Sequence, residues 1–209
     1  MADSIYERKD FISLTDMIPG AILEIRYFST YNFIGDRING YEAPVALITK
    51  EAARALKNAA VQLYVRGYRL RIYDAYRPAS AVKHFVYWGI EDTDVRMKEY
   101  FYPKLEKQEL FKEGYIASKS SHSRGSTVDL TLFDMKTGKD LDMGSPFDLF
   151  DDISHPDSRL VTPEQYENRM ILQKAMTDSG FAPIEQEWWH FTLENEPFPE
   201  TYFDFPVSL

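Results

Sequence analysis

Cysteine is absent from this 209-residue sequence, which excludes disulfide bridges, thiolate metal sites and cysteine nucleophiles. Any metal ion would have to be bound by histidine or carboxylate side chains. The sequence also lacks a run of about 18 apolar residues, the length that a membrane-spanning helix needs. Its first residues show no basic segment followed by an apolar stretch. We therefore expect no membrane segment and a cytoplasmic location.

Basic residues are also fewer than acidic ones. Lysine and arginine number 24 against 33 aspartates and glutamates, so the formal net charge is −9. Because an acidic chain repels the phosphate backbone, this balance argues against a nucleic-acid partner. With 44% hydrophobic residues the composition is that of an ordinary globular protein, and a chain of this length can bury a core without cross-links.

Strand-like and helix-like patterns intermix along the chain without linkers or repeats. The patterns predict strands at 21–27, 68–76, 127–133 and 187–193, and helices at 51–66, from Pro78 onwards and at 162–179. Residues 91–118 are predicted as an irregular or helical insertion and 134–160 as a loop. Because strands and helices do not alternate strictly, we predict one α+β domain over residues 1–209, with a largely antiparallel sheet flanked by helices.

The strand predicted at 127–133 carries polar residues at alternate positions. Thr127, Asp129 and Thr131 share one face, which predicts a half-buried strand with a functional side. Asp129 lies between Val128 and Leu130, where a carboxylate needs a compensating partner if it is buried. A metal ion would be such a partner.

The chain has only four histidines, and two of them lie in dense polar motifs. The first motif runs from Ser120 to Asp129 and reads SSHSRGSTVD. His122 and Asp129 would face opposite ways on one regular strand, but Gly125 permits a turn or bulge between them. Both side chains could then reach one cation.

The second motif, EWWH, places Glu187 three residues before His190. A turn or bulge would let both converge on one site, where His190 completes the two-histidine, one-carboxylate set common in catalytic zinc sites. Glu187 would then act as the general base toward a water molecule. Either motif alone would be a weak signal; together they predict one Zn²⁺ per chain. His84 and His155 are predicted to be structural.

Arg77 lies in the segment YDAYRP, between a predicted strand and Pro78. The proline keeps the backbone of Arg77 extended. An arginine fixed in this way could stabilise an oxyanion or bind a carboxylate. An ordinary capping or salt-bridged arginine would show the same pattern, and composition alone favours that interpretation.

Eight motifs, taken together, resemble the VanX-type D-alanyl-D-alanine dipeptidases. They follow one another along nearly the whole chain: YRP at 76–78, SKSSHSRGS at 118–126, DLTL at 129–132, MGS at 143–145, FD at 147–148, SGF at 179–181, EWWH at 187–190 and YFDFP at 202–206. The resemblance implies a small α+β fold shared with zinc D,D-carboxypeptidases and the hedgehog signalling domain.

The resemblance also implies roles for the two motifs and for Arg77. His122, Asp129 and His190 would be the zinc ligands, and Glu187 the base and proton shuttle. Arg77 would stabilise the tetrahedral intermediate, which replaces the salt-bridge interpretation of this residue.

Substrate contacts follow from the same resemblance. Ser120 and Asp148 occupy positions associated with the free ammonium of the substrate, and Tyr41 and Phe85 positions associated with the pocket. Asp74 would orient its neighbours from behind the site. The stretches 91–118 and 134–160 are expected to wall the cavity.

The implied activity is zinc-dependent hydrolysis of D-alanyl-D-alanine and similar small D,D-dipeptides, with a small dipeptide as the expected partner. Such an enzyme would serve glycopeptide resistance or the recycling of peptidoglycan fragments. One alternative is a D,D-carboxypeptidase or endopeptidase that acts on longer peptidoglycan peptides. Another is a non-catalytic zinc module of the same fold, against which Glu187 and Arg77 argue. No pattern in the sequence indicates an oligomeric state.

Overall fold

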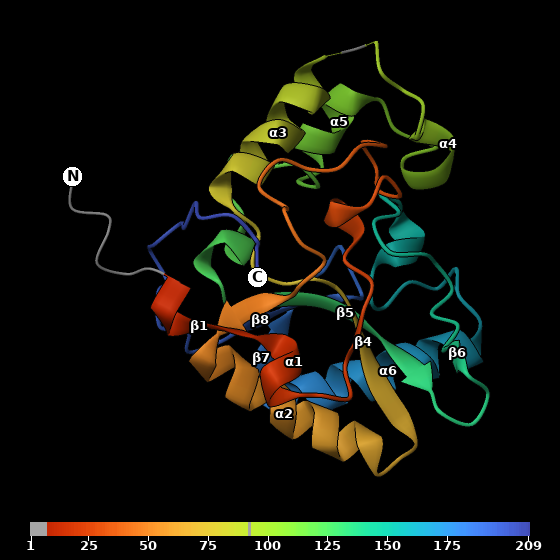
Figure 1. Ribbon diagram of the computed structural model, residues 1–209. Coiled ribbons are helices and arrows are strands. Elements are labelled where there is room, and N and C mark those ends of the chain that lie inside the picture. Colours follow the sequence, from red (N-terminus) through yellow and green to blue (C-terminus); the bar gives the residue numbers. More distant parts are fainter. Residues whose placement is uncertain (1–7, 92) are drawn as a thin grey trace.

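A mostly antiparallel sheet runs through the middle of the molecule. The computed structural model describes residues 8–91 and 93–209 (Figure 1). The strand order is β2-β4-β5-β8-β7, and β6 pairs with β5. Only β2 and β4 pair in parallel among these described strands. The strands are β2 Ile22–Leu23, β4 Tyr68–Asp74, β5 Thr127–Asp134, β6 Lys139–Asp140, β7 Phe181–Pro183 and β8 His190–Leu193.

Helices cover both faces of this sheet. Figure 1 shows α2 (Lys50–Tyr64) and α6 (Pro163–Thr177) below it, and α3 (Ala79–Ile90), α4 (Lys98–Phe101) and α5 (Lys107–Lys112) above it. A two-stranded antiparallel sheet of β1 (Phe11–Ser13) and β3 (Leu47–Thr49) lies beside the short helix α1 (Leu14–Met17). The predicted α+β fold with a largely antiparallel sheet is therefore confirmed.

The two long lower helices begin at threonines, as the sequence predicts. The Thr49 side chain accepts a hydrogen bond from the backbone N–H of Ala52 at the start of α2. Thr162 and Gln165 form a capping box at the start of α6, which satisfies two N–H groups that the helix itself cannot. Gly67, at φ 90°, follows the end of α2 and Gly180, at φ 87°, the end of α6. The predicted boundaries hold to within a few residues.

Strand β5 is buried more completely than its alternating pattern predicts. All residues from Thr127 to Leu132 are buried, polar and apolar alike. The strand lies between β4 and β8, and the predicted half-buried strand is wrong because chain segments also cover its polar face. Polar side chains on that face consequently need partners inside the protein.

Other sequence predictions fail at the ends of strands. The strand predicted at 21–27 is limited to β2, and a 3₁₀ turn, η2 (Arg26–Phe28), follows it. The strand predicted at 187–193 begins only at His190, so Glu187 lies in the preceding turn. Strands β1, β3 and β7 were not predicted, nor was β6, which lies in the predicted loop 134–160, because short strands have no clear periodicity of their own.

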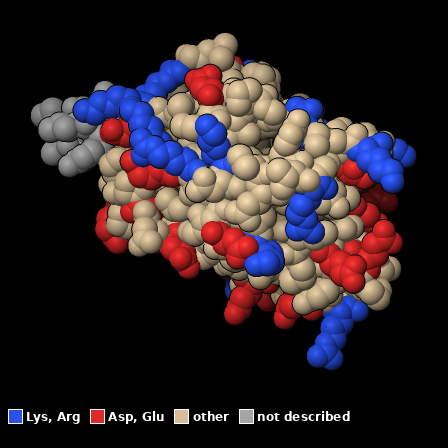
Figure 2. Space-filling model, turned by 90° about the horizontal axis from the view of Figure 1, so that it is seen from below, with Lys and Arg blue, Asp and Glu red and all other residues tan. Residues whose placement is uncertain are grey.

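The lower face of the molecule shows charges of both signs. In Figure 2, Lys and Arg side chains are interspersed with Asp and Glu around a largely uncharged central area. No helix among the described residues has the length and apolar character needed to cross a membrane.

Gly125 makes the turn that separates His122 from Asp129. It ends the 3₁₀ helix η3 (Ser121–Arg124) at φ 82°, a left-handed conformation that favours glycine. A Cβ atom at this position would lie 2.2 Å from Cε1 of Phe11. The turn and the close packing therefore both require glycine.

We expect Gly125→Ala to lower the free energy of unfolding by about 2–5 kcal/mol, because left-handed strain adds to overpacking. Urea denaturation measures this loss. Gly67→Ala is the matched control: its φ is 90°, but no heavy atom lies within 4 Å of the added Cβ, so it should cost only about 1–2 kcal/mol. Equal losses in the two variants would contradict the packing argument.

Candidate active site and metal centre

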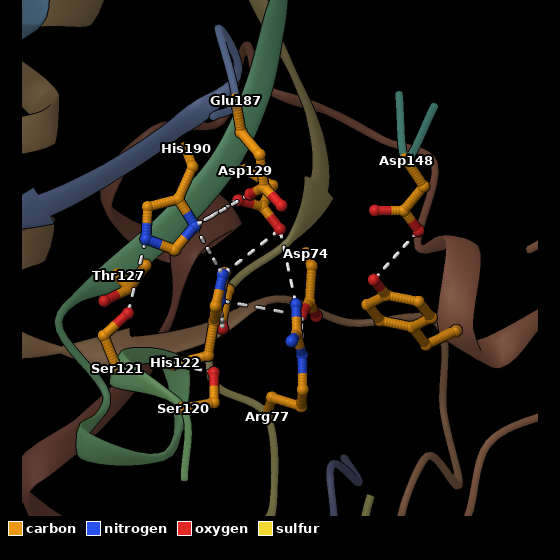
Figure 3. Close-up of polar contacts among 12 residues, drawn as sticks. Asp74, Arg77, Ser120, Ser121, His122, Thr127, Asp129, Asp148, Glu187 and His190 are labelled. Atoms are coloured by element: carbon orange, nitrogen blue, oxygen red, sulfur yellow. Dashed lines mark hydrogen bonds and ion pairs between the residues drawn. The ribbon is translucent and has the colours of Figure 1, made fainter. Parts of the chain in front are cut away.

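Two aspartates and one histidine lie in one row across the sheet. Asp129 on β5 pairs directly with His190 on β8 and with Asp74 at the end of β4. The register of β4 against β5 shifts between Ile72 and Asp74, so Tyr73 is an extra residue and Asp74 is turned into the row. Sheet register therefore fixes how these side chains meet (Figure 3).

His122 reaches the same row from η3. The Ser120 side chain accepts a hydrogen bond from the His122 backbone N–H at the start of η3, and Gly125 ends it. His122 Nε2 lies 3.2 Å from Asp129 Oδ2 and 3.2 Å from His190 Nδ1. His190 Nδ1 lies 3.1 Å from Asp129 Oδ1. The structure thus brings together His122, Asp129 and His190, all buried, as the sequence predicts.

The hydrogen bonds around these residues leave lone pairs facing inward. His122 Nδ1 lies 2.7 Å from the Ala75 carbonyl oxygen, which can only accept, so Nδ1 carries the proton and Nε2 does not. His190 Nε2 contacts the Ser121 and Thr192 hydroxyls, which leaves its Nδ1 toward Asp129. Asp129 Oδ1 is buried without a hydrogen-bond partner among the described residues.

This arrangement fits a divalent cation. Electron-rich atoms about 3 Å apart repel one another unless a proton or metal ion lies between them. Ligands at about 2.0–2.2 Å around a tetrahedral zinc ion are roughly 3.4 Å apart, close to the 3.1–3.2 Å separations between the facing atoms of His122, Asp129 and His190. The donor set and its spacing are therefore those of a metal site.

The carboxylate groups of the site differ in their pKa. Burial alone would raise the pKa of Asp129, but His122 and His190 lower it to a value well below the usual range. Glu187 Oε2 lies 3.6 Å from His190 Nδ1. Burial raises the pKa of Glu187 to about 7. Asp129 is thus charged, whereas Glu187 is balanced between its two protonation states near neutral pH.

Arg77 is held by two carboxylates. Its Nε donates to Asp74 Oδ2 at 2.9 Å, and a terminal nitrogen donates to Asp129 Oδ2 at 3.4 Å. The guanidinium also lies over the rings of Tyr27 and Phe85, at 4.8 and 5.2 Å from their centroids. Arg77 therefore has a fixed position beside the candidate metal ligands (Figure 3).

A small cavity opens in front of these groups, between the sheet and α3. Its volume is about 130 Å³, below the roughly 300–1,000 Å³ of pockets for drug-sized ligands. Residues from both stretches predicted to wall the cavity line it. Tyr115 and Ile116 belong to the stretch 91–118, and Asp148 and Phe150 belong to the stretch 134–160. The expectation that 91–118 and 134–160 wall the cavity is confirmed for the described residues.

Asp148 faces the cavity from an unusual backbone conformation. Its φ is 62°, the one positive value among the described non-glycine residues, and conformations of this kind cluster at functional sites. Asp148 Oδ2 accepts a hydrogen bond from the Tyr27 hydroxyl at 2.9 Å. Burial, with Asp129 and Glu187 nearby, raises the pKa of Asp148 well above its usual value. A cationic ligand group would compensate this carboxylate.

Comparison with known proteins identifies the family. The model of a family described as D-ala-D-ala dipeptidase matches residues 7–208. The chain belongs to this family. It is therefore a peptidase, in a family of metallopeptidases.

Relatives from several bacteria agree with the family match. The D-alanyl-D-alanine dipeptidase of Enterococcus faecalis is 43% identical over 95% of this chain and 98% of its own length. The dipeptidase of the same name from Streptomyces coelicolor is 41% identical over the same shares. That of Escherichia coli is 32% identical over 88% of this chain and 84% of the relative. The similarity thus covers nearly the whole chain.

The other residues predicted from the dipeptidase resemblance divide into two groups. Ser120 and Phe85 line the cavity. Tyr41 does not line it, and its prediction as a pocket residue is corrected: its hydroxyl donates to Asp74 Oδ1 at 2.6 Å, behind Arg77. Asp74 accepts hydrogen bonds from both Tyr41 and Arg77. Burial raises the pKa of Asp74.

His84 and His155 lie outside the group of three candidate metal ligands. His84 Nδ1 accepts a hydrogen bond from the Asn39 backbone N–H. The backbone carbonyl of His155 accepts from Arg169. The structural roles of both histidines stay predictions.

Sequence reasoning missed two residues that support Asp148. Tyr27 ends a predicted strand and gives no separate signal. Arg169 on α6 is almost fully buried and donates to the carbonyl oxygens of Met143, Ile153 and His155 at 2.6–2.8 Å. It thereby holds both ends of the loop that carries Asp148. Because these partners lie far from Arg169 in the sequence, no local sequence pattern indicates the role of this arginine.

We expect Tyr41→Phe to lower the free energy of unfolding by about 1–3 kcal/mol, because Asp74 Oδ1 loses its buried hydrogen-bond donor. Urea denaturation of the variant tests this. Tyr64→Phe, at a tyrosine that is 61% exposed, serves as the control and should change stability by less than about 0.5 kcal/mol. A Tyr41→Phe protein as stable as the wild type would contradict the supporting role of Tyr41.

Proposed function

We propose that this protein is a zinc-dependent D-alanyl-D-alanine dipeptidase. The observation that carries the proposal is the convergence of three buried ligand atoms from His122, Asp129 and His190 beside Glu187. The names of relatives at 41–43% identity over nearly the full chain support the substrate. Two histidines with one carboxylate form a common catalytic zinc set, which supports zinc as the metal.

His122, Asp129 and His190 would hold the ion, and Glu187 would remain free. A zinc ion at this position supplies Lewis acidity, which acidifies a water molecule and polarises a peptide carbonyl. The hydrogen bond from His122 to the Ala75 carbonyl fixes the ring and tautomer of His122, and contacts with the Ser121 and Thr192 hydroxyls hold the ring of His190. The protein thus prepares the ligand positions before the ion binds.

Glu187 acts as the proton carrier in this proposal. Its carboxylate takes a proton from the attacking water and passes it to the nitrogen of the departing amine. The turn before β8 places it next to His190 without including it among the three candidate ligands. A side chain so placed can move between accepting and donating a proton within one catalytic cycle.

Arg77 stabilises the negative charge that develops on the carbonyl oxygen. Asp74 holds its Nε, while the guanidinium lines the cavity next to Asp129. A preorganised cation in a site largely closed to water is worth more than one in bulk solvent. Because Asp74 and Tyr41 fix it from behind, Arg77 loses little freedom as charge develops.

The cavity favours a dipeptide over longer peptides. Asp148, with the Tyr27 hydroxyl beside it, offers a carboxylate to the free ammonium of a short substrate, and Phe85 offers an apolar wall for a small side chain. A D,D-carboxypeptidase or endopeptidase needs an open groove for the rest of its peptide. A cavity of about 130 Å³ supports the dipeptidase instead, and the presence of Glu187 and Arg77 disfavours a non-catalytic zinc module.

We expect the zinc-loaded protein to hydrolyse D-alanyl-D-alanine with a kcat/KM at least about 100-fold above that for a pentapeptide ending in D-Ala-D-Ala, because blocking the ammonium leaves buried Asp148 without a cationic partner from the substrate. The assay measures released D-alanine. Equal or greater activity on the pentapeptide would contradict the proposal in favour of the carboxypeptidase.

We expect Glu187→Gln to lower kcat by a factor of about 100 to 10,000, because the amide cannot accept the proton. The metal content of the variant should equal that of the wild type. Glu185→Gln is the matched control, since Glu185 is exposed, two residues away and not on the cavity wall. Substantial turnover by Glu187→Gln would overturn the assigned role.

A further inference from the structure

Three carboxyl groups and two cations are among the described residues that line the cavity. Asp129, Asp148 and Glu187 supply the carboxyl groups, and Arg77 and Lys119 are the two cations. A free dipeptide carries a carboxylate as well as an ammonium group. Its carboxylate needs a cation in a cavity otherwise dominated by acids.

Arg77 is already committed to other groups. Asp74 and Asp129 both accept hydrogen bonds from its guanidinium. The faces of Tyr27 and Phe85 also hold it in place. The charge of Arg77 is therefore balanced inside the protein before any substrate carboxylate arrives.

Lys119 differs in this respect. Its Nζ lies 4.8 Å from the centroid of the Tyr202 ring. No carboxylate within the described chain forms an ion pair with it. An aromatic face attracts an ammonium group without neutralising it. Tyr202 therefore holds Lys119 at the cavity while the full positive charge stays available.

Lys119 and Asp148 line the same cavity from two different segments of the chain. The ammonium and the carboxylate of a dipeptide lie on opposite sides of its single peptide bond. Figure 3 shows Asp148 on one side of the candidate metal ligands and Ser120, the neighbour of Lys119 in sequence, on another side. Because Asp148 and Lys119 line the same small cavity, a dipeptide with its ammonium at Asp148 brings its carboxylate within the same space as Lys119.

We propose that Lys119 binds the free α-carboxylate of the substrate and so makes the enzyme select molecules that end one residue after the scissile bond. Lys119 is then a specificity-determining residue in the same cavity as Asp148. This inference rests on the proposed dipeptidase function and extends it from the ammonium end of the substrate to its carboxylate end.

The test compares Lys119→Met with the wild type on D-alanyl-D-alanine and on its C-terminal amide, which lacks the negative charge. We expect KM for the free dipeptide to rise by about tenfold, as for the loss of one charged contact, with kcat changed less than about twofold. KM for the amide, or its inhibition constant, should stay within about twofold of the wild-type value. Lys119→Arg should restore most of the preference for the free acid.

Lys112→Met is the matched control, because Lys112 is an exposed lysine on α5 that does not line the cavity. It should behave as the wild type does. An unchanged preference of Lys119→Met for the free acid over the amide would overturn the inference and leave the proposed function intact. An equal loss on both compounds would also overturn it, by showing a structural role. A wild type inactive on D-alanyl-D-alanine would overturn the proposed function itself, and this inference with it.

Discussion

The buried carboxylate of Asp129 is the constraint on which the site depends. It lies on the central strand β5, and one of its oxygens has no hydrogen-bond partner among the described residues. Its neighbours His122 and His190 both direct a ring nitrogen toward it, and that of His122 is unprotonated. Arg77 contacts Oδ2 of this carboxylate at 3.4 Å, but the buried Oδ1 has no such contact, and a charged carboxylate in such a place is very unfavourable unless a cation compensates it. The surrounding structure is best understood as the means of placing that cation.

Each part of the fold contributes one component of the site. Pairing of β5 with β8 sets His190 beside Asp129, and the turn at Gly125 returns His122 to the same point. A second layer lies behind: Tyr41 holds Asp74, and Asp74 holds Arg77. Catalytic groups held by packed neighbours lose little free energy to reorganisation during the reaction. The cavity walls come from loops, which the sheet and the helices keep in place.

The ligand set could be predicted from the sequence because both motifs are local. SSHSRGSTVD and EWWH bring their residues close through short turns, and Gly125 marks the first turn directly. Tyr27, Arg169 and the burial of β5 could not be predicted, because each depends on contacts between distant parts of the chain. Tyr41 was misplaced for the same reason: its partner Asp74 is fixed by a β-bulge that no pattern in the sequence shows.

The metal content of the purified protein tests the central claim most directly. Inductively coupled plasma mass spectrometry should find one zinc ion per chain in the wild type. The same measurement on His190→Ala, which removes a ligand and leaves Glu187 and Arg77 in place, should find far less than one. A wild type without stoichiometric metal, or a His190→Ala protein that keeps a full complement of zinc, would contradict the account.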